Sequence, residues 1–453
     1  MTIESRPILI IGAGVSGLCL AEGLRKNTKI PFRIFERDPS LHARSQGYRV
    51  RVSGEGIEAL RHNLPSDRFD RLRANACAFV HYGSTHNSID HIVDGMTGGL
   101  GQLANTWKAD AESKAKFHNH LGDADEKDDK PLAVDRTVLR EVMYEGLADV
   151  VEFNKNLVHY DLLEDDTVRA AFKDGTTVEG SALIGSDGCW SHTRRQLLPK
   201  YSLKDSEARV IWGKAELTDE FVAALPPLAR DGLGLFVTPD LKVLFESMRF
   251  DRSSAHADVK LMPKDYFYYL CYPRKDALNG LNDEQFLYLS NDEAGNLAKR
   301  LTKDWETSAQ VPFQRVTPHA ASVSRIPTAT PDLPTWDAQG PVTLMGDAVH
   351  SSKREFCKPR LRNMFQWLTD SLSVAPTAAL GATTALRDSY HLARELEKLS
   401  ASPSPTDIEG ALRQYEKHMR VYAAQALEFS AAGGRAVFGF RGFENIPEIE
   451  LHD

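Results

Sequence analysis

A glycine turn between an apolar strand and an apolar helix most restricts how this chain can fold. Residues 7–11 (PILII) read as a buried strand, and residues 15–26 read as the helix that follows the glycines. In such a turn Gly12 permits the sharp bend, Gly14 lets a pyrophosphate approach the backbone, and Gly17 allows close packing of helix on strand. The helix N-terminus adds amide donors and a positive dipole. The pattern predicts a Rossmann-like dinucleotide-binding unit.

The strand after this helix supplies an acidic partner for the glycine turn. Residues 31–37 (PFRIFER) read as that strand. Glu36 ends it about twenty residues after the glycines, where an acid can bind ribose hydroxyls. Arg37 is a candidate adenine-side contact, although a solvated surface arginine explains it nearly as well. A purely structural turn is the alternative for the glycines. Because NAD and FAD share this fingerprint, it does not choose between them.

Composition limits the class of protein. The chain has 453 residues, 42% of them hydrophobic and 26% charged, enough for one large composite domain or two interleaved ones. A net charge of −8 gives no reason to expect nucleic acid or an anionic membrane as partner. Beyond the glycine-containing N-terminal stretch there is no long apolar run, so we expect no membrane span. Five scattered cysteines suit a reducing compartment, and we predict a cytoplasmic protein.

The expected elements after the first unit mix strands and helices. Residues 48–52 (YRVRV) alternate strictly, which predicts a half-exposed strand, and residues 134–148 predict a helix. Residues 168–188 predict a hairpin that turns at Asp174-Gly175, followed by a further strand. Strand-like runs between about 208 and 330 predict a separate sheet. Long amphipathic helices are expected at roughly 381–399 and 407–431.

Two further strings carry chemistry. Residues 183–197 (LIGSDGCWSHTRRQL) contain Asp187-Gly188, which read alone would be only a turn. The other string is written in two pieces, PVTLMGDAVHS at 341–351 and VAPTAALGATTALRD at 374–388. A basic segment of different character lies between the pieces. Joined, they read GDAVHSVAPTAALGATTALRD.

These strings and the glycine turn resemble the motifs of the FAD-dependent aromatic hydroxylases, the single-component (group A) flavoprotein monooxygenases. The three motifs occur in the family's order and span residues 12 to 388. The resemblance implies FAD, with Asp187 and Gly188 near its pyrophosphate and Gly346-Asp347 at its ribityl chain. It also implies that the following proline, helix and backbone amides lie against the isoalloxazine ring. The residues concerned are Pro376, Gly381 and Ala382.

Two arginines are further candidates for the cofactor site. Arg136 matches the family's Arg-x-x-Leu helix start, where the arginine approaches FAD; the alternative is a surface residue at a helix N-terminus. Arg51 lies where the family often carries a small or polar residue beside the flavin. Arg49 shares its face of the strand, so alternation does not choose between the two. The aromatic run Tyr266–Tyr269 could line an apolar substrate pocket, but only half of its side chains can face one side.

The resemblance implies an α/β fold in which a Rossmann-like FAD-binding domain is interleaved with a mainly β substrate domain and C-terminal helices. We expect the FAD-binding domain at 1–200, with a polar excursion at 106–130, and the substrate domain at 201–330. The second part of the FAD-binding domain and the C-terminal helices would occupy 331–453. His118, His120 and Asp123 lack a second cluster, so we predict no metal site.

The implied reaction is FAD-dependent monooxygenation. NAD(P)H would act as a transient co-substrate, and O₂ would reach a small aromatic or polyketide-like substrate through a C4a-hydroperoxyflavin, giving hydroxylation or epoxidation. The residues do not identify a catalytic base. The alternatives are a catalytically impaired flavoprotein whose flavin loop is broken, and an FAD-dependent reductase on the same scaffold.

The segment at about 352–373 decides between these alternatives. Deleting it restores the family's spacing between Asp347 and Pro376. One hypothesis is a translated intron, because Ser352-Lys353 can be encoded with a donor-like sequence. The other is a genuine insertion that loops outward and leaves the flavin contacts intact. Sequencing the transcript separates the two.

Overall fold

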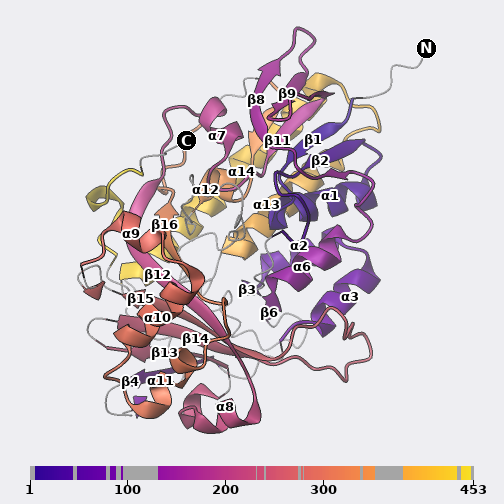
Figure 1. The fold of residues 1–453 in the computed structure, drawn as a ribbon. Coiled ribbons are helices and arrows are strands. Elements are labelled where there is room, and N and C mark those ends of the chain that lie inside the picture. The colour runs from indigo at the N-terminus through magenta and orange to yellow at the C-terminus, as the bar shows by residue number, and fades with distance from the viewer. Residues whose placement is uncertain are drawn as a thin grey trace.

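The protein is built around two large sheets, each with its own helices (Figure 1). The structure is a computed structural model. It describes residues 6–43, 48–77, 82–87, 93–94, 131–230, 232–238, 241–273, 277–278, 280–336, 340–351, 381–435 and 440–449. Pro376, the segment 352–373, the polar excursion 106–130 and the His118–Asp123 cluster lie outside these residues. Within the described ranges, no helix combines the length and the apolar character needed to cross a membrane.

Five parallel strands form the sheet below the glycine turn, in the order β17-β11-β1-β2-β7. Ile10 on the central strand β1 pairs with Ile184 on one side and Ile34 on the other. Parallel strands are covered on both faces, which is why they read as continuous apolar runs. The strands are β1 (Ile8–Ile11), β2 (Phe32–Phe35), β7 (Val151–Glu152), β11 (Ala182–Gly185) and β17 (Val342–Leu344).

Helices from both ends of the sequence cover this sheet, and Figure 1 shows the indigo N-terminal elements beside the orange C-terminal ones. Helix α1 (Val15–Asn27) packs against α13 (Gly381–Leu396) and α2 (Glu55–Asn63), and α13 also packs against α14 (Pro405–Gly433). The predicted strand–helix–strand unit and the two C-terminal helices are therefore confirmed. We call the parallel sheet with α1, α2, α13 and α14 the cofactor domain, after the ligand that its glycine turn predicts. Its elements come from both the first and the last part of the chain.

A small antiparallel sheet, β8-β9-β10, lies between β7 and β11 in sequence. It comprises β8 (Leu157–Leu162), β9 (Val168–Phe172) and β10 (Thr177–Gly180). The β9–β10 hairpin turns at Asp174-Gly175, as predicted, and Gly175 has φ +84°, a conformation that glycine adopts without strain.

The second large sheet has the order β16-β12-β15-β14-β13-β4-β5. Its strands are β4 (Tyr82–Asn87), β5 (Val93–Asp94), β12 (Lys204–Glu216), β13 (Gly232–Val237), β14 (Leu241–Met248), β15 (Tyr266–Pro273) and β16 (Ser322–Thr328). The separate sheet predicted from the middle of the chain is present. It also takes β4 and β5 from before residue 100, so it draws on sequence outside the expected range 201–330.

The two faces of this sheet belong to different cores. Trp212, Tyr266 and Tyr268 belong to the core shared with the cofactor domain. Phe267 and Tyr269 face the opposite side, where helices cover them. These helices are α8 (Asp219–Ala224), α9 (Asp283–Leu287), α10 (Asn291–Leu301) and α11 (Thr307–Gln314). Alternation along β15 therefore directs half of the aromatic run toward the cofactor domain.

A two-stranded ribbon joins the two large units. Strand β3 (Arg49–Val52) runs antiparallel to β6 (Leu132–Asp135), and Cys77 bridges Ala133 of β6 to Phe250 after β14. The prediction that the strand at 48–52 is half-exposed is wrong, because every residue of β3 is buried. Arg49 forms an ion pair with Glu246 of β14, so the polar face of the strand meets the second sheet instead of water.

The helix expected at 134–148 is shorter than predicted. Residues 132–135 complete β6, and α6 (Arg136–Tyr144) begins only after Asp135, whose side chain accepts a hydrogen bond from the Thr137 amide. An aspartate at this position caps a helix rather than extending it. The remaining short helices are α3 (Ser66–Ala74), α7 (His192–Leu197), α12 (Asp347–His350), η1 (Pro227–Ala229) and η4 (Phe443–Asn445).

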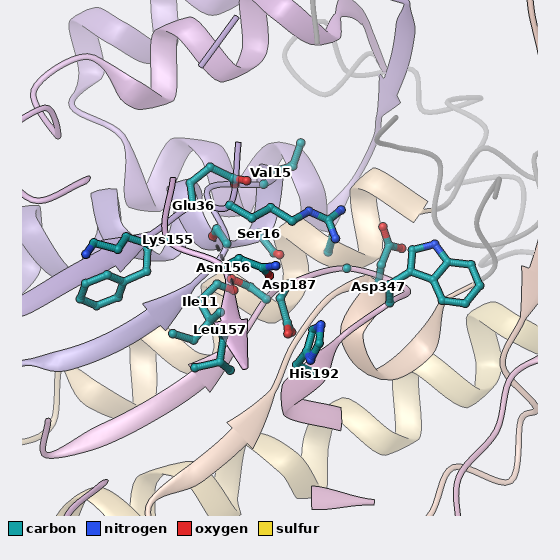
Figure 2. Close-up of a pocket in the computed structure, with 18 of the residues that line it drawn as sticks. Ile11, Val15, Ser16, Glu36, Lys155, Asn156, Leu157, Asp187, His192 and Asp347 are labelled. Atoms are coloured by element: carbon teal, nitrogen blue, oxygen red, sulfur yellow. Dashed lines mark hydrogen bonds between the residues drawn. The ribbon is translucent and has the colours of Figure 1, made fainter. Parts of the chain in front are cut away.

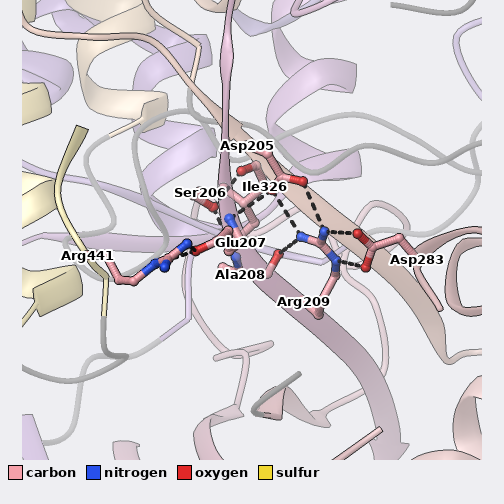
Figure 3. Close-up of polar contacts among 8 residues, drawn as sticks. All are labelled: Asp205, Ser206, Glu207, Ala208, Arg209, Asp283, Ile326 and Arg441. Atoms are coloured by element: carbon pink, nitrogen blue, oxygen red, sulfur yellow. Dashed lines mark hydrogen bonds and ion pairs between the residues drawn. The ribbon is translucent and has the colours of Figure 1, made fainter. Parts of the chain in front are cut away.

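A bulge in β12 is held by charged groups (Figure 3). The Arg209 guanidinium is 1% exposed and donates to Asp205 on its own strand and to Asp283 at the start of α9, with the closest contact at 2.6 Å. Arg441, from the C-terminal tail, pairs with Glu207 on the outside of the same bulge. One bulge therefore carries a buried and an exposed arginine contact.

These two arginines predict unequal losses of stability. Arg209→Met should lower the free energy of unfolding by about 3 kcal/mol, because it leaves the largely buried Asp205 without its counter-ion. Arg441→Met removes a contact between side chains that are 58% and 34% exposed, and should cost under about 1 kcal/mol. Urea unfolding of both variants measures the difference. Equal decreases in the free energy of unfolding would show that the buried Arg209 contact stabilises the fold no more than the exposed Arg441 contact.

Candidate cofactor site

A pocket opens at the carboxyl ends of β1, β2 and β11, the edge of a parallel sheet where ligands bind. It encloses about 820 Å³, part of which is open to solvent. Figure 2 shows Glu36, Asp187 and Asp347 around this one pocket, although they come from three distant parts of the sequence. Its lining consists of Ile11, Gly12, Gly14, Val15, Ser16, Phe35, Glu36, Arg37, Arg136, Lys155, Asn156, Leu157, Ser186, Asp187, Gly188, Trp190, His192, Asp347, Ala382 and Ala385.

The glycine turn forms the floor of the pocket. Gly12 has φ +108°, and a Cβ there would lie 2.5 Å from the Ser186 carbonyl oxygen, so no larger residue fits. A Cβ on Gly17 would lie 2.1 Å from the Gly12 carbonyl oxygen, which shows how closely α1 packs on the turn. A Cβ on Gly14 would meet no protein atom within 4 Å. The open space beside Gly14 is where a ligand can approach the backbone.

Glu36 forms the rim of the pocket at the end of β2. Its carboxylate accepts hydrogen bonds from the amides of Ala13, at 2.8 Å, and Asp38, at 3.0 Å. These contacts fix the carboxylate beside the glycine turn. Arg37 lines the same rim.

Asp187 and Gly188 form the opposite wall. The Asp187 carboxylate accepts from the Ser191 hydroxyl and, at 3.3 Å, from the Thr193 amide, so it orders the start of α7. Arg194 of α7 is 1% exposed and donates to the Ala348 carbonyl at 3.0 Å and to the Cys189 carbonyl at 2.6 Å. Arg194 thereby ties the loop that contains Asp187 to helix α12.

The described parts of the two outer pieces, 341–351 and 381–388, both contribute residues to this pocket. Gly346 has φ +60° and precedes Asp347, the first residue of α12. Gly381 begins α13, and Ala382 in its first turn lines the pocket together with Asp347. Gly381 is buried but is not among the lining residues.

The two predicted arginines lie in different surroundings. Arg136, the first residue of α6, lines the pocket and is 4% exposed, so the surface alternative does not apply. Arg51 is also buried, but it lies beside Arg49 and Glu246 and outside the pocket lining. Burial, together with the charge of Arg49, lowers the pKa of Arg51 to about 9.

Several residues of the site carried no signal in the sequence. Ser16 and Ser186 lie inside recognised motifs at variable positions, and only the fold places them on the pocket. Lys155, Asn156 and Leu157 enter the pocket from the start of β8, which has no motif at all.

The most consequential of the unrecognised residues is Asp388, at the end of the split string. This buried carboxylate accepts from the Gly346 amide, from His350 at 2.7 Å and from the Tyr422 hydroxyl at 2.6 Å. Burial alone would lower the pKa of His350, but the charge and hydrogen bond of Asp388, with a contribution from Asp347, raise it above its ordinary value. His350 is thus a hydrogen-bonding residue within the structure.

His350 and His391 predict opposite pH dependences. The pKa of His350 is higher in the folded protein than in the unfolded chain, where it is near 6.5. His350 therefore stabilises the fold at pH values below about 6.5, and this contribution is lost as the pH rises through the folded pKa. The pKa of His391 is lowered to about 4, chiefly by burial and next by the charge of Arg387. The contribution of His391 to stability is therefore lost as the pH falls below about 6.5, where the unfolded chain takes up a proton first.

Chemical unfolding between about pH 5 and 9 tests this pair, since both histidines titrate from near 6.5. The stability difference between wild type and His350→Asn should shrink as pH rises. The difference between wild type and His391→Asn should shrink as pH falls. The same slope for both variants would contradict the assignment.

Comparison with known proteins agrees with this geometry. Residues 10–81 match the family described as NAD(P)-binding Rossmann-like domain. The chain is 31% identical to the dual O-methyltransferase/FAD-dependent monooxygenase elcB of Phaeosphaeria nodorum, over 98% of this chain and 47% of that protein. It is 25% identical to the chloroplastic zeaxanthin epoxidase of Oryza sativa, over 94% of this chain and 55% of that protein. The chain spans about half the length of the curated relatives it matches.

Solved structures share the fold. The 2,6-dihydroxypyridine-3-hydroxylase of Arthrobacter nicotinovorans superposes with a TM-score of 0.65 at 16% identity, covering 99% of each chain. HpxO of Klebsiella pneumoniae, in complex with FAD and uric acid, superposes with a TM-score of 0.62 at 18% identity, covering 94% of this chain and 88% of that one. These comparisons agree with the resemblance drawn from the sequence: almost the whole chain is similar to part of proteins named FAD-dependent monooxygenase, and it shares the fold of these solved structures.

Proposed function

We propose that this chain binds FAD in the pocket at the sheet edge and acts as a monooxygenase. It would use NAD(P)H and O₂ to add one oxygen atom to a small organic substrate of the aromatic or polyketide-like kind. The observation that carries the proposal is the convergence of all three motifs on one pocket: Gly14, Asp187 and Asp347 line it together, and so does Ala382. Residues so far apart in sequence have no local reason to share a cavity.

The residues of the pocket fit the successive parts of FAD. The open space at Gly14 and the N-terminus of α1 suit a pyrophosphate, because the helix presents amide donors and a positive dipole. Glu36 on the neighbouring strand suits the ribose hydroxyls of the adenosine half. Asp347 and the first turn of α13 lie farther along the pocket, where the ribityl chain and the flavin ring would follow.

Bound FAD would supply hydride acceptance from NAD(P)H and activation of O₂. The protein would supply position, charge and exclusion of water. Arg136 offers a buried cation at the pocket, which favours negative charge on a ligand. Glu36 and Asp187 are held by hydrogen bonds and so keep their places without a ligand's help.

Buried aromatic side chains link the pocket residue Arg136 to the second sheet. On its cofactor-facing side the ring of Tyr48 packs edge-on against Trp212, at 5.8 Å between centroids, and stacks with Tyr268 at 6.5 Å. The Arg136 guanidinium lies 6.0 Å from the Tyr48 ring. Flat aromatic groups therefore continue from the pocket toward the second sheet. The relatives named FAD-dependent monooxygenase and zeaxanthin epoxidase support oxygenation over a reductase role.

Purified protein tests the proposal directly. We expect bound FAD in a one-to-one ratio, visible in the absorption spectrum. With a substrate of the correct class, NAD(P)H and O₂ should be consumed together, and isotopically heavy O₂ should place one heavy atom in the product. A variant lacking 352–373 serves as the control for the interrupted loop. A colourless, folded protein that takes up FAD only after this deletion would favour the impaired-flavoprotein alternative.

The glycine turn predicts two different failures of FAD binding. Gly14→Val should weaken FAD binding at least about tenfold, roughly 1.4 kcal/mol, because its side chain enters the open space beside the backbone. Apoprotein stability should stay nearly unchanged, because a Cβ at this position meets no protein atom within 4 Å. Gly17→Ala should lower the apoprotein melting temperature as well, because its methyl group would collide with the Gly12 carbonyl. Fluorescence titration with FAD and calorimetry of the apoproteins measure both effects. Normal FAD affinity in Gly14→Val would show that the pyrophosphate does not bind beside Gly14.

A further inference from the structure

Asp388 lies at the junction of the three parts of the cofactor site. It is fully buried on α13, two turns after the first residue of that helix. Its carboxylate accepts three hydrogen bonds, from the Gly346 amide at 2.5 Å, from His350 Nε2 at 2.7 Å and from the Tyr422 hydroxyl at 2.6 Å. The first two donors belong to the loop that carries Asp347, and the third belongs to α14.

The residue beside Asp388 reaches the remaining part of the site. The Ser389 hydroxyl donates to the Ser16 carbonyl of α1 at 2.8 Å. Ser16 also lies close to Gly346, since a Cβ on Gly346 would come within 2.8 Å of the Ser16 hydroxyl oxygen. Two consecutive residues of α13 therefore hold both the glycine-turn helix and the Gly346-Asp347 loop.

A buried carboxylate is costly unless charged or dipolar donors surround it. The donors here come from two chain segments, the Gly346–His350 loop and α14, so satisfying the carboxylate on α13 requires all three segments to be in place. Every one of these contacts is made by residues outside 352–373, the segment that separates the two pieces of the split string in the sequence.

We propose that Asp388 is the positioning residue of the flavin loop: it sets Gly346–His350 against α13, so that Asp347 and Ala382 face the same ligand. Asp388 does not line the pocket and acts through the residues that it holds. This role rests on FAD as the ligand but on no particular substrate or reaction.

Glu416 provides a matched control. It is also a buried carboxylate with two short contacts, accepting from Trp336 Nε1 and the Thr343 hydroxyl, each at 2.7 Å. Thr343 lies on β17, directly before the flavin loop. Among the described residues, Glu416 contacts Trp336, Thr343 and Arg420, none of which belongs to Gly346–His350 or α13. A general loss of core stability would therefore affect the Glu416 and Asp388 variants alike.

The experiment compares Asp388→Asn with Glu416→Gln in the full chain. The apoprotein melting temperature should fall in both. The dissociation constant for FAD, measured well below either melting temperature, should rise at least about tenfold, roughly 1.4 kcal/mol, only in Asp388→Asn. The visible circular dichroism of flavin bound at saturation should also change only in Asp388→Asn, because the loop that touches the flavin has moved.

Two results would overturn the proposal: FAD affinity in Asp388→Asn within about twofold of wild type, under roughly 0.5 kcal/mol, or an equal loss in Glu416→Gln. If Asp388→Asn does not fold, His350→Gln replaces it in the experiment, because His350 is the partner of Asp388 on the loop. This variant should show the same rise in the dissociation constant for FAD. If wild type itself binds no FAD, the proposed function fails first, so the two failures are distinguishable.

Discussion

The cofactor site depends on one buried negative charge, the carboxylate of Asp388. It lies in a region without solvent, and its charge is balanced by a histidine whose pKa it raises and by amide and phenol donors. A buried polar network of this kind is stable only when every member is satisfied. The arrangement of β17, α12, α13 and α14 is therefore specified by chemistry as well as by apolar packing.

A second set of buried charges joins the cofactor domain to the large antiparallel sheet. Asp135 caps α6 and also accepts from the Tyr266 hydroxyl at 3.0 Å and from Lys214 at 3.3 Å, both on that sheet. Arg136, which lines the pocket, is the next residue along the chain. Together with the Arg49–Glu246 pair, this contact fixes how the aromatic face of the sheet meets the pocket. The orientation of the two units is thus set close to the place where a substrate would meet the flavin.

Features that depend on local sequence were predictable. The strand–glycine–helix unit is such a feature, and so is the hairpin at Asp174-Gly175, because turn residues and periodicity act over short distances. Strand β3 was mispredicted as half-exposed because its alternation of arginine and valine is the pattern of a wetted strand. The distant Glu246 supplies the opposite charge that makes burial of Arg49 acceptable. Asp388 gave no sign of its role, since a carboxylate on an amphipathic helix usually faces water.

The segment 352–373, which interrupts the flavin loop in the sequence, adds little to the free energy needed to close that loop. Both of its ends are anchored: the Ser351 carbonyl accepts from the Ala329 amide at the end of β16, and α13 is held through Asp388 and Ser389. Without 352–373 the connection would comprise 374–380, so the present one is roughly four times longer. Each doubling of loop length costs only about 0.6 kcal/mol in closure entropy, or about 1.2 kcal/mol here. That cost is small beside a typical folding stability of about 5–15 kcal/mol. The added length of the connection is therefore not enough to prevent the two pieces of the motif from lying together in space. FAD binding then depends on Asp388 keeping the anchored pieces together.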